Sequence, residues 1–453
     1  MKRRGYAAPT AIQAQALPVV LSGRDAIGIA TTGSGKTAAY LLPFIVHAMD
    51  QSPLQKGDGP IGLVLAPTHE LAEQVTMEAR KFAKGDGLRA VGVWGGVGKY
   101  EQLKELKAGA DIVVGTPGRL LELIRPKGGQ SSGLSLRRVT YVVLDEADRM
   151  FSLGFEPQVR SLLGQVRPDR QTVLFSATFR PALERLARDA LSEPVRVTVG
   201  EVGEANDDVT QVVEVLPNAD AKWGWLVARL PHFAKAGTVL VFVSQKAQSE
   251  ELARSLAAQT GEAVDAIHGD RTQAERQEAL RAFKRGSTRL LVATDVASRG
   301  LDIPAIKTVI NFDVARRAED HTHRIGRTGR AGATDGTAYT LVTHGEADAA
   351  VDLVRSLRSA SQAPPPDLIE LAQRSRRWAA SGLAEPKAVV HNQPIVPPPP
   401  PPPPGAGAVG GGDVSQCAPP QVYQMEKLKA AAPGDPVAMA KLVAARLSAQ
   451  GAA

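Results

Sequence analysis

The chain has 453 residues, a hydrophobic fraction of 43% and a formal net charge of +7, a length that suits two or three domains with ordinary globular cores. The positive charge favours a polyanionic partner. The single cysteine, Cys417, excludes an intramolecular disulfide and a cysteine metal cluster and indicates a reducing compartment. No run of 18 apolar residues occurs, so no membrane-spanning helix is expected.

The first segment, Met1-Lys2-Arg3-Arg4 with the alanines that follow, partly resembles a signal peptide. Gln13, Gln15 and Pro18 interrupt its apolar stretch, so a nucleotide-binding segment is the better interpretation.

Residues 24–199 alternate short β-branched runs with amphipathic stretches. Strands are predicted at 25–30, 61–66, 112–114, 141–144 and 172–175, and helices at 70–84 and 182–191. This alternation predicts a parallel sheet covered by helices on both faces.

The alternation stops at residues 200–208, a stretch of glycine and acidic residues that is interpreted as a linker, and then resumes. Strands are predicted at 238–243, 263–267, 290–293, 308–311 and 337–342, and helices at 249–258, 273–285 and 345–358. Two tandem α/β domains are therefore expected, at 1–199 and 209–358. Polar segments at the carboxyl ends of their strands should face a cleft between them.

A basic extension is expected at 359–396 and a low-complexity tail at 397–453. The tail contains eight consecutive prolines at 397–404, which favour a polyproline helix, and a flexible glycine-rich run at 405–412. Residues 436–448 have a helical composition. The whole tail is expected to be a disordered Pro/Gly-rich segment that suits a tether or a ligand for a proline-recognising partner.

A phosphate-binding loop follows the first predicted strand. Its sequence is Ala30-Thr31-Thr32-Gly33-Ser34-Gly35-Lys36-Thr37, with Ala30 where the general pattern has a glycine. Glycines let backbone N–H groups wrap phosphates, Lys36 can reach the terminal phosphates, and the Thr37 hydroxyl can bind Mg²⁺. The sequence therefore predicts ATP and Mg²⁺ as ligands, with Thr32, Gly33, Ser34 and Gly35 in the cradle.

Asp145-Glu146-Ala147-Asp148 directly follows the buried strand predicted at 141–144. Asp145 is expected to hold Mg²⁺ through water, and Glu146 is expected to orient or deprotonate an attacking water. The alternative is a solvated acidic turn, which fits poorly after a buried strand.

The order of these segments, followed by His323-Arg324-Ile325-Gly326-Arg327-Thr328-Gly329-Arg330, resembles the DEAD-box RNA helicases of helicase superfamily two. The resemblance covers roughly residues 1–358 and implies two RecA-like domains. It implies that Arg327 and Arg330 are arginine fingers and that Asp302 contacts the ribose. It also implies that Ser176, Thr178, Asp148 and His323 couple the nucleotide state to domain closure.

Residues 5–13 resemble the adenine-reading segment of the same family. The Gln13 amide has a donor and an acceptor for the adenine edge, and Tyr6 can stack on the ring. Family members usually carry a further aromatic residue upstream, so the sequence is suspected to be a fragment.

The resemblance also implies an RNA surface in both domains. Its members are Pro67, Thr68, Gly96, Thr116, Arg119, Gly269, Gln273, Arg276, Thr294 and Asp295. Small residues and helix N-termini let the backbone approach phosphates, so recognition should depend little on base sequence. His69 departs from the family, which usually has arginine there.

The expected function is an ATP-dependent RNA helicase that locally unwinds short duplexes or remodels ribonucleoproteins. The alternatives are an ATP-gated RNA clamp or scaffold and a DNA translocase. Residues 203–211 and 313–316 look like the subgroup associated with the U2 small nuclear ribonucleoprotein in pre-mRNA splicing, which favours the nucleus over the cytoplasm. A monomer is expected.

Overall fold

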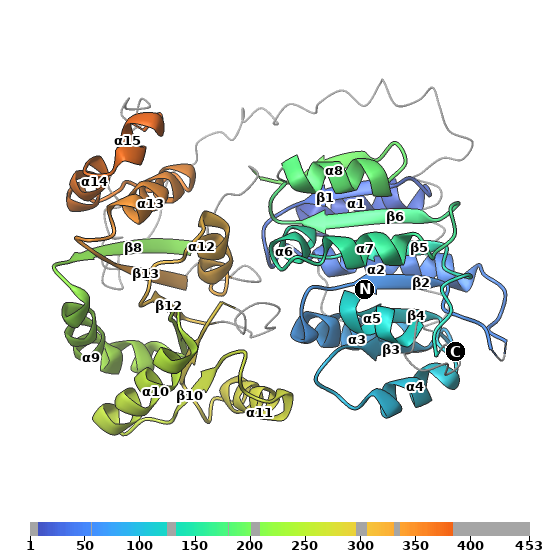
Figure 1. Ribbon diagram of the computed structural model, residues 1–453, viewed down its shortest axis with the longest axis horizontal. Coiled ribbons are helices and arrows are strands. Elements are labelled where there is room, and N and C mark those ends of the chain that lie inside the picture. Colours follow the sequence, from blue (N-terminus) through green and yellow to red (C-terminus); the bar gives the residue numbers. More distant parts are fainter. Residues whose placement is uncertain are drawn as a thin grey trace, which may run out of the picture.

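The structure is a computed structural model and describes residues 8–55, 57–124, 133–179, 181–200, 209–295, 306–329 and 336–383. Within these ranges the chain forms two α/β units that lie side by side (Figure 1). The expected fold class, two RecA-like parallel-sheet domains, is confirmed. The predictions for residues 201–208 and for the tail at 397–453 lie outside the described residues.

The first unit contains a seven-stranded, wholly parallel sheet in the order β3-β4-β2-β5-β6-β1-β7. Its strands are β1 (Ala26–Ile29), β2 (Gly62–Leu65), β3 (Ala90–Val93), β4 (Ile112–Gly115), β5 (Tyr141–Leu144), β6 (Gln171–Ser176) and β7 (Val195–Thr198). Its helices are α1 (Ala11–Leu21), α2 (Lys36–Met49), α3 (His69–Ala83), α4 (Lys99–Lys107), α5 (Pro117–Ile124), α6 (Ala147–Ser152), α7 (Glu156–Leu163) and α8 (Pro181–Ala190).

Both faces of this sheet are covered, because successive side chains of a strand point to opposite faces. On β5, Tyr141 and Val143 pack with residues of α1, α2 and α3. Val142 and Leu144 pack on the other side with α5, α6, α7 and α8. The continuous apolar runs seen in the sequence are therefore buried central strands.

The strand order sets the position of the polar loops. β5, β6 and β1 are neighbours, and Ile29 at the end of β1 lies opposite Ser176 at the end of β6. Parallel strands all end at the same edge of the sheet, where ligands of open α/β sheets bind. The loops that begin at Ala30, Asp145 and Ala177 consequently emerge beside one another.

The second unit contains a six-stranded parallel sheet in the order β10-β11-β9-β12-β13-β8. Its strands are β8 (Val209–Leu216), β9 (Val239–Phe242), β10 (Val264–Ile267), β11 (Leu290–Ala293), β12 (Thr308–Asn311) and β13 (Gly336–Thr343). Its helices are α9 (Ala219–Ala236), α10 (Lys246–Thr260), α11 (Gln273–Lys284), α12 (Ala318–Ile325), α13 (Ala347–Ser359), α14 (Pro366–Gln373) and α15 (Arg376–Ala380).

Three strands were not predicted from the sequence, and all three lie at sheet edges. β3 and β7 flank the first sheet, and β8 flanks the second. Edge strands carry more polar side chains than central ones: β7 alternates apolar with polar residues, and β8 contains Thr210, Gln211 and Glu214. Gly92 interrupts the apolar run of β3. The continuous apolar signal that marks the central strands is therefore missing at these edges.

The second unit also extends past residue 358, where the sequence analysis placed its end. Leu368, Leu371 and Ala372 of α14 are buried in the same cluster as Val351 and Val354 of α13. Figure 1 shows α14 and α15 against α13 at the outer end of the unit. The expected basic extension therefore begins with helices that complete this core. Within the described ranges no helix is long and apolar enough to cross a membrane.

Leu368→Ala should destabilise the second unit by about 2–5 kcal/mol, because it removes a fully buried side chain and leaves a cavity. Urea unfolding followed by tryptophan fluorescence measures this change, since three of the four tryptophans, Trp223, Trp225 and Trp378, lie in this unit. Glu370→Ala, at an exposed position of the same helix, is the control. Equal stability of the two variants would show that α14 is not part of the core.

Candidate functional site

The phosphate loop joins β1 to α2 in a conformation that requires glycine. Gly33 and Gly35 have φ angles of 83° and 92°, in the left-handed region that glycine adopts without strain. Lys36 is buried, and its Nζ donates to the carbonyl oxygens of Ala30 (2.6 Å) and Thr31 (3.2 Å). The loop thus encloses the ammonium group that was predicted to reach phosphates.

Gln13 joins α1 to this loop. Its Nε2 donates to the carbonyl oxygen of Gly35 (3.0 Å), and its Oε1 accepts from the backbone N–H of Thr10 (3.1 Å). A methyl group at Gly35 would lie 2.5 Å from this Nε2. One hydrogen and one lone pair of the amide are left over, so adenine contact through Gln13 stays a prediction.

Asp145 is buried at the carboxyl end of β5. Its Oδ2 accepts a hydrogen bond from the Tyr40 hydroxyl (2.8 Å), and its Oδ1 accepts one from the backbone N–H of Glu146 (3.0 Å). Burial raises the pKa of Asp145 to about 6, and the charge of Glu146 acts in the same direction. Tyr40 is a contact that sequence reasoning missed, although it lies one helical turn after Thr37.

Glu146 has a φ angle of 47°, which is unusual for a residue with a side chain. This conformation turns the backbone sharply between β5 and α6. Sequence reasoning gave Glu146 a catalytic role but provided no sign of this strain.

The donor set suits a magnesium ion that arrives with a nucleotide. The described residues hold no group of three or more His, Cys, Asp or Glu side chains placed to bind a metal. Mg²⁺ commonly binds one or two protein oxygens and completes its shell with water and substrate phosphates. A cation beside Asp145 would also offset its repulsion by Glu146. The residues present therefore fit the ion.

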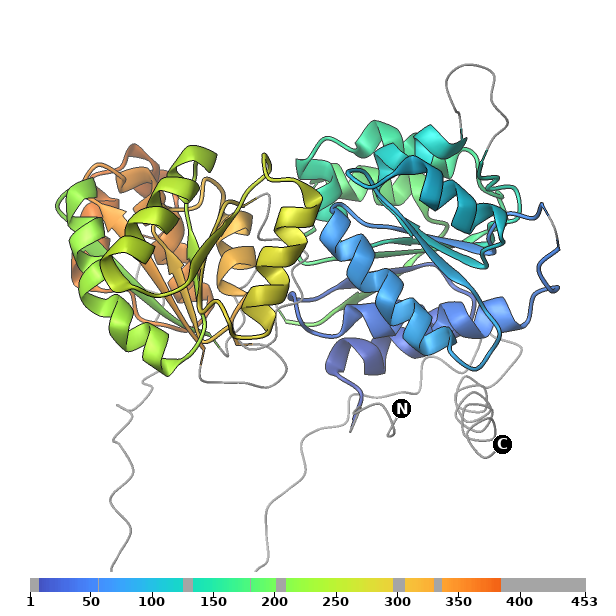
Figure 2. The same ribbon diagram turned by 90° about the horizontal axis from the view of Figure 1, so that it is seen from below.

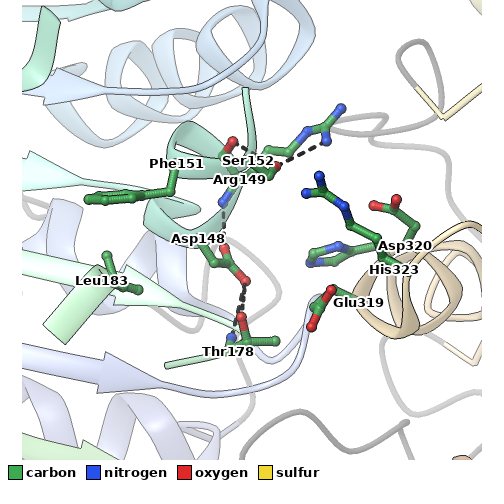
Figure 3. Close-up of a pocket in the computed structure, with 10 residues that line it drawn as sticks. Asp148, Arg149, Phe151, Ser152, Thr178, Leu183, Glu319, Asp320 and His323 are labelled. Carbon is green, nitrogen blue, oxygen red and sulfur yellow. Dashed lines mark hydrogen bonds between the residues drawn. The ribbon is translucent and has the colours of Figure 1, made fainter. Parts of the chain in front are cut away.

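The four predicted coupling residues come together between the two units. Asp148 Oδ2 accepts hydrogen bonds from the Thr178 backbone N–H (3.1 Å) and hydroxyl (2.9 Å), and Ser176 Oγ accepts one from the Asp148 backbone N–H (3.3 Å). In Figure 3, His323 reaches from α12 toward Asp148 and Thr178, and all three line one pocket.

Groups of both units favour the ionised form of the Asp148 carboxylate. Burial acts to raise the pKa of Asp148, but His323, Lys36 and the hydrogen bonds from Thr178 and Ser176 outweigh it, so its pKa lies below the usual value. An ionised carboxylate of the first unit therefore faces an imidazole of the second.

The second unit also reaches the phosphate loop. A methyl group at Gly326, at the end of α12, would lie 2.7 Å from the Thr32 hydroxyl oxygen. Arg327 follows directly, is buried, and donates from Nε to the carbonyl oxygen of His323 (3.2 Å). The structure thus brings Arg327 to the same junction as the loop. Tyr6, Asp302 and Arg330 lie outside the described residues.

Several predicted RNA residues meet at a second junction, where α11 approaches α3 (Figure 2). Thr68 caps α3, and Gln273 begins α11. His69 Nδ1 lies 3.3 Å from Gln273 Oε1, and the loop at Gly96 packs against both side chains. His69, the departure from the family pattern, thus faces the second unit here.

Of the other predicted RNA residues, three belong to the first unit and two to the second. Pro67 precedes the cap of α3, and Thr116 directly precedes α5. Arg119 donates to the carbonyl oxygen of Val97 (3.1 Å), while Gly269 and Thr294 follow the strands β10 and β11.

Two of the predicted RNA residues have side chains that are paired within the protein, and their RNA contacts stay predictions. Arg276 is buried and its guanidinium pairs with the buried Glu70 of α3, so it joins the two units. A buried charge requires such a partner. Asp295 accepts from Arg324 Nε (2.6 Å) and Nη2 (2.8 Å), so its carboxylate is paired within the second unit and would repel a phosphate. Glu70 and Arg324 were not identified from the sequence as members of these pairs.

The chain was also compared with known proteins. Residues 10–186 match the family described as DEAD/DEAH box helicase, and residues 221–332 match the helicase conserved C-terminal domain. The chain is 57% identical over 378 residues to DEAD-box ATP-dependent RNA helicase 24 of Arabidopsis thaliana, covering 83% of this chain and 49% of that protein. It is 53% identical over 375 residues to ATP-dependent RNA helicase DDX42 of Homo sapiens, covering 83% of this chain and 39% of that protein. The chain therefore spans about half the length, or less, of these curated relatives.

Solved structures show the same architecture. S. cerevisiae Dbp5 bound to RNA and ADP BeF3 is 28% identical with a TM-score of 0.70, over 82% of this chain and 94% of that one. Mss116p bound to ssRNA and AMP-PNP is 24% identical with a TM-score of 0.70, over 83% of this chain and 79% of that one, and shares the fold. With both family matches in chain order on the two α/β units, the chain belongs to the DEAD/DEAH box helicase family.

Proposed function

We propose that the chain is an ATP-dependent RNA helicase core, which binds ATP between its two units and couples hydrolysis to local RNA remodelling. The observation that carries this proposal is a convergence of three segments. The phosphate loop, the acidic segment after β5 and the end of α12 all meet at one junction, with Gly326 beside Thr32. The names of the curated relatives and the RNA and nucleotide in the Dbp5 structure support it.

Nucleotide binding would use both the backbone and the side chains of the loop. The N–H groups at Gly33–Gly35 and the N-terminus of α2 favour phosphate oxygens. Lys36 would exchange its two carbonyl contacts for the terminal phosphates. Thr37 and Asp145 would hold Mg²⁺, which supplies charge neutralisation to the phosphates when bound.

Hydrolysis would require groups from both units. Glu146, next to Asp145, would orient or deprotonate the attacking water. Arg327 and Arg330 would stabilise the charge that develops on the transferred phosphoryl group, since guanidinium forks suit phosphate oxygens. The full set is therefore assembled only when the units are together.

RNA would bind where helix N-termini of both units converge. The starts of α3 and α11 lie beside Gly96, and backbone N–H groups at such positions bind phosphates without reading bases. The Asp148–Thr178–His323 group would connect this closed arrangement to the nucleotide. Closure and RNA binding then support each other through contacts made only in the closed state.

The proposed protein partners and the proposed compartment rest on the sequence. The resemblance of residues 203–211 and 313–316 to the U2-associated subgroup supports ribonucleoproteins as partners and the nucleus as the compartment. The octaproline at 397–404 supports a proline-recognising partner.

Glu146→Gln should lower RNA-stimulated ATP turnover by about 10²–10⁴-fold, because only the activation of water is lost. ATP affinity should stay close to that of the parent, and the RNA complex should last longer. Single-turnover hydrolysis and nucleotide titration measure the two quantities.

Glu184→Gln, on the exposed face of α8, is the matched control and should behave like the parent. Parent-rate turnover by the Glu146 variant would remove Glu146 from the reaction.

Arg276→Glu should weaken RNA binding in the presence of a non-hydrolysable ATP analogue, because two buried carboxylates would then face each other in the closed state. Loss of a buried pair costs on the order of 3 kcal/mol. The variant should also lower the fluorescence energy transfer between a dye on each unit, which reports how closely the units approach. Combining Arg276→Glu with Glu70→Arg should recover part of the RNA affinity and part of the energy transfer.

This double variant separates the interunit role of Arg276 from an RNA contact. If Arg276 held RNA, the glutamate at position 276 would still repel phosphates, and the double variant would bind as weakly as the single one.

RNA affinity should fall steeply with salt and depend little on base sequence. For single strands, log K is expected to fall against log salt with a slope of about −0.7 for each phosphate contacted. Titrations of several unrelated oligonucleotides at a series of salt concentrations measure the slope. A strong preference for one short sequence that persists at high salt would contradict backbone recognition.

A further inference from the structure

A buried tyrosine-to-carboxylate contact lies behind the phosphate loop. Tyr40 is on α2, fully buried, and its hydroxyl donates to Asp145 Oδ2 at 2.8 Å. The ring packs against Phe175 of β6 with a centroid distance of 5.5 Å. Its backbone carbonyl accepts a hydrogen bond from the Tyr141 hydroxyl (3.1 Å). The phenol is therefore held in one position by its ring contact with Phe175 and its hydrogen bond to Asp145.

Tyr40 also lies beside the other residue expected at the magnesium ion. It follows Thr37 by three positions on α2, so the two side chains share one face of the helix. The Tyr40 hydroxyl thus links α2, which carries Thr37, to Asp145, which directly follows β5.

The hydrogen bonds of Asp145 leave its carboxylate able to accept further hydrogen bonds. Each oxygen of the carboxylate has one donor, Glu146 N–H on Oδ1 and Tyr40 O–H on Oδ2. A carboxylate accepts about four hydrogen bonds, so lone pairs are left for the water shell of a cation. The two donors fix the plane of the carboxylate before any ligand arrives.

We propose that Tyr40 is a positioning residue for the divalent cation, which orients the Asp145 carboxylate and keeps it in register with Thr37. This inference deepens the proposed function and rests on it. Partners that orient a metal ligand commonly change metal affinity by about 10–100-fold when they are removed. The nucleotide itself should be held by the loop independently of the phenol.

Tyr40→Phe tests the inference, because phenylalanine keeps the ring packing and removes only the hydroxyl. Binding of a fluorescent ADP is measured at a series of Mg²⁺ concentrations and again in excess chelator. The variant should need about 10-fold more Mg²⁺ for half-maximal tightening of ADP binding. Its affinity for ADP in chelator should equal that of the parent.

Tyr141→Phe is the matched control. It removes another fully buried tyrosine hydroxyl from the same core, one that bonds the Tyr40 carbonyl and not Asp145. It should leave the Mg²⁺ requirement unchanged. Melting temperatures of both variants without metal show whether each is folded.

The outcomes of these titrations separate failure of the inference from failure of the proposed function. A Tyr40→Phe protein with the Mg²⁺ requirement of the parent overturns the inference, and so does an equal shift in both variants or an equal loss of ADP affinity with and without Mg²⁺. Parent protein that binds no ADP at any Mg²⁺ concentration would instead overturn the proposed function, and the inference with it. A shift confined to Tyr40→Phe and to Mg²⁺ supports it.

Discussion

The parallel direction of β5, β6 and β1 is the constraint on which the rest of the molecule depends. Parallel neighbours need a crossover between them, so their carboxyl ends lie at one edge and their following loops share one space. The loop after β1 is thereby brought beside the loops after β5 and β6, which lie more than a hundred residues further along the chain. The buried apolar strands thus position the polar groups, although Ser176 at the end of β6 is the one predicted site residue that these three strands contain.

Charge burial at the junction between the units follows from that arrangement. Asp148 faces His323, and Glu70 pairs with Arg276, each with one member on either unit. A buried charge without a partner is costly, so each unit alone would leave these groups to water. Contacts of this kind favour one relative placement of the units more than they add to stability.

Much of the fold could be predicted from the sequence, because the central strands are uninterrupted apolar runs bounded by turn residues. β5 and β11 were predicted with the bounds that the structure gives them. The edge strands β3, β7 and β8 lacked that signal, since a strand with one neighbour carries more polar residues. Helix α14 was missed because Pro364 and Pro365 precede it and Pro366 begins it, and a run of three prolines suggests an irregular segment.

The parts of the candidate site that could be predicted are those whose residues are adjacent in the sequence. The phosphate loop and the segment at Asp145 are both contiguous in sequence, and the structure places them together. Side-chain partners across the chain were not predictable. Nothing in the sequence says that Arg276 would pair with Glu70, or that Arg324 would pair with Asp295. The first pairing depends on how the two units meet, and the second on how distant segments of the second unit pack together.

The backbone of Glu146 has a consequence for how the protein could be made more robust. A left-handed conformation at a residue with a side chain costs on the order of 1–3 kcal/mol, which glycine would recover. Laboratory selection for heat resistance alone would therefore tend to replace this glutamate. The most heat-resistant descendants would be those that had lost the carboxylate beside the nucleotide, so durability and turnover would have to be selected together.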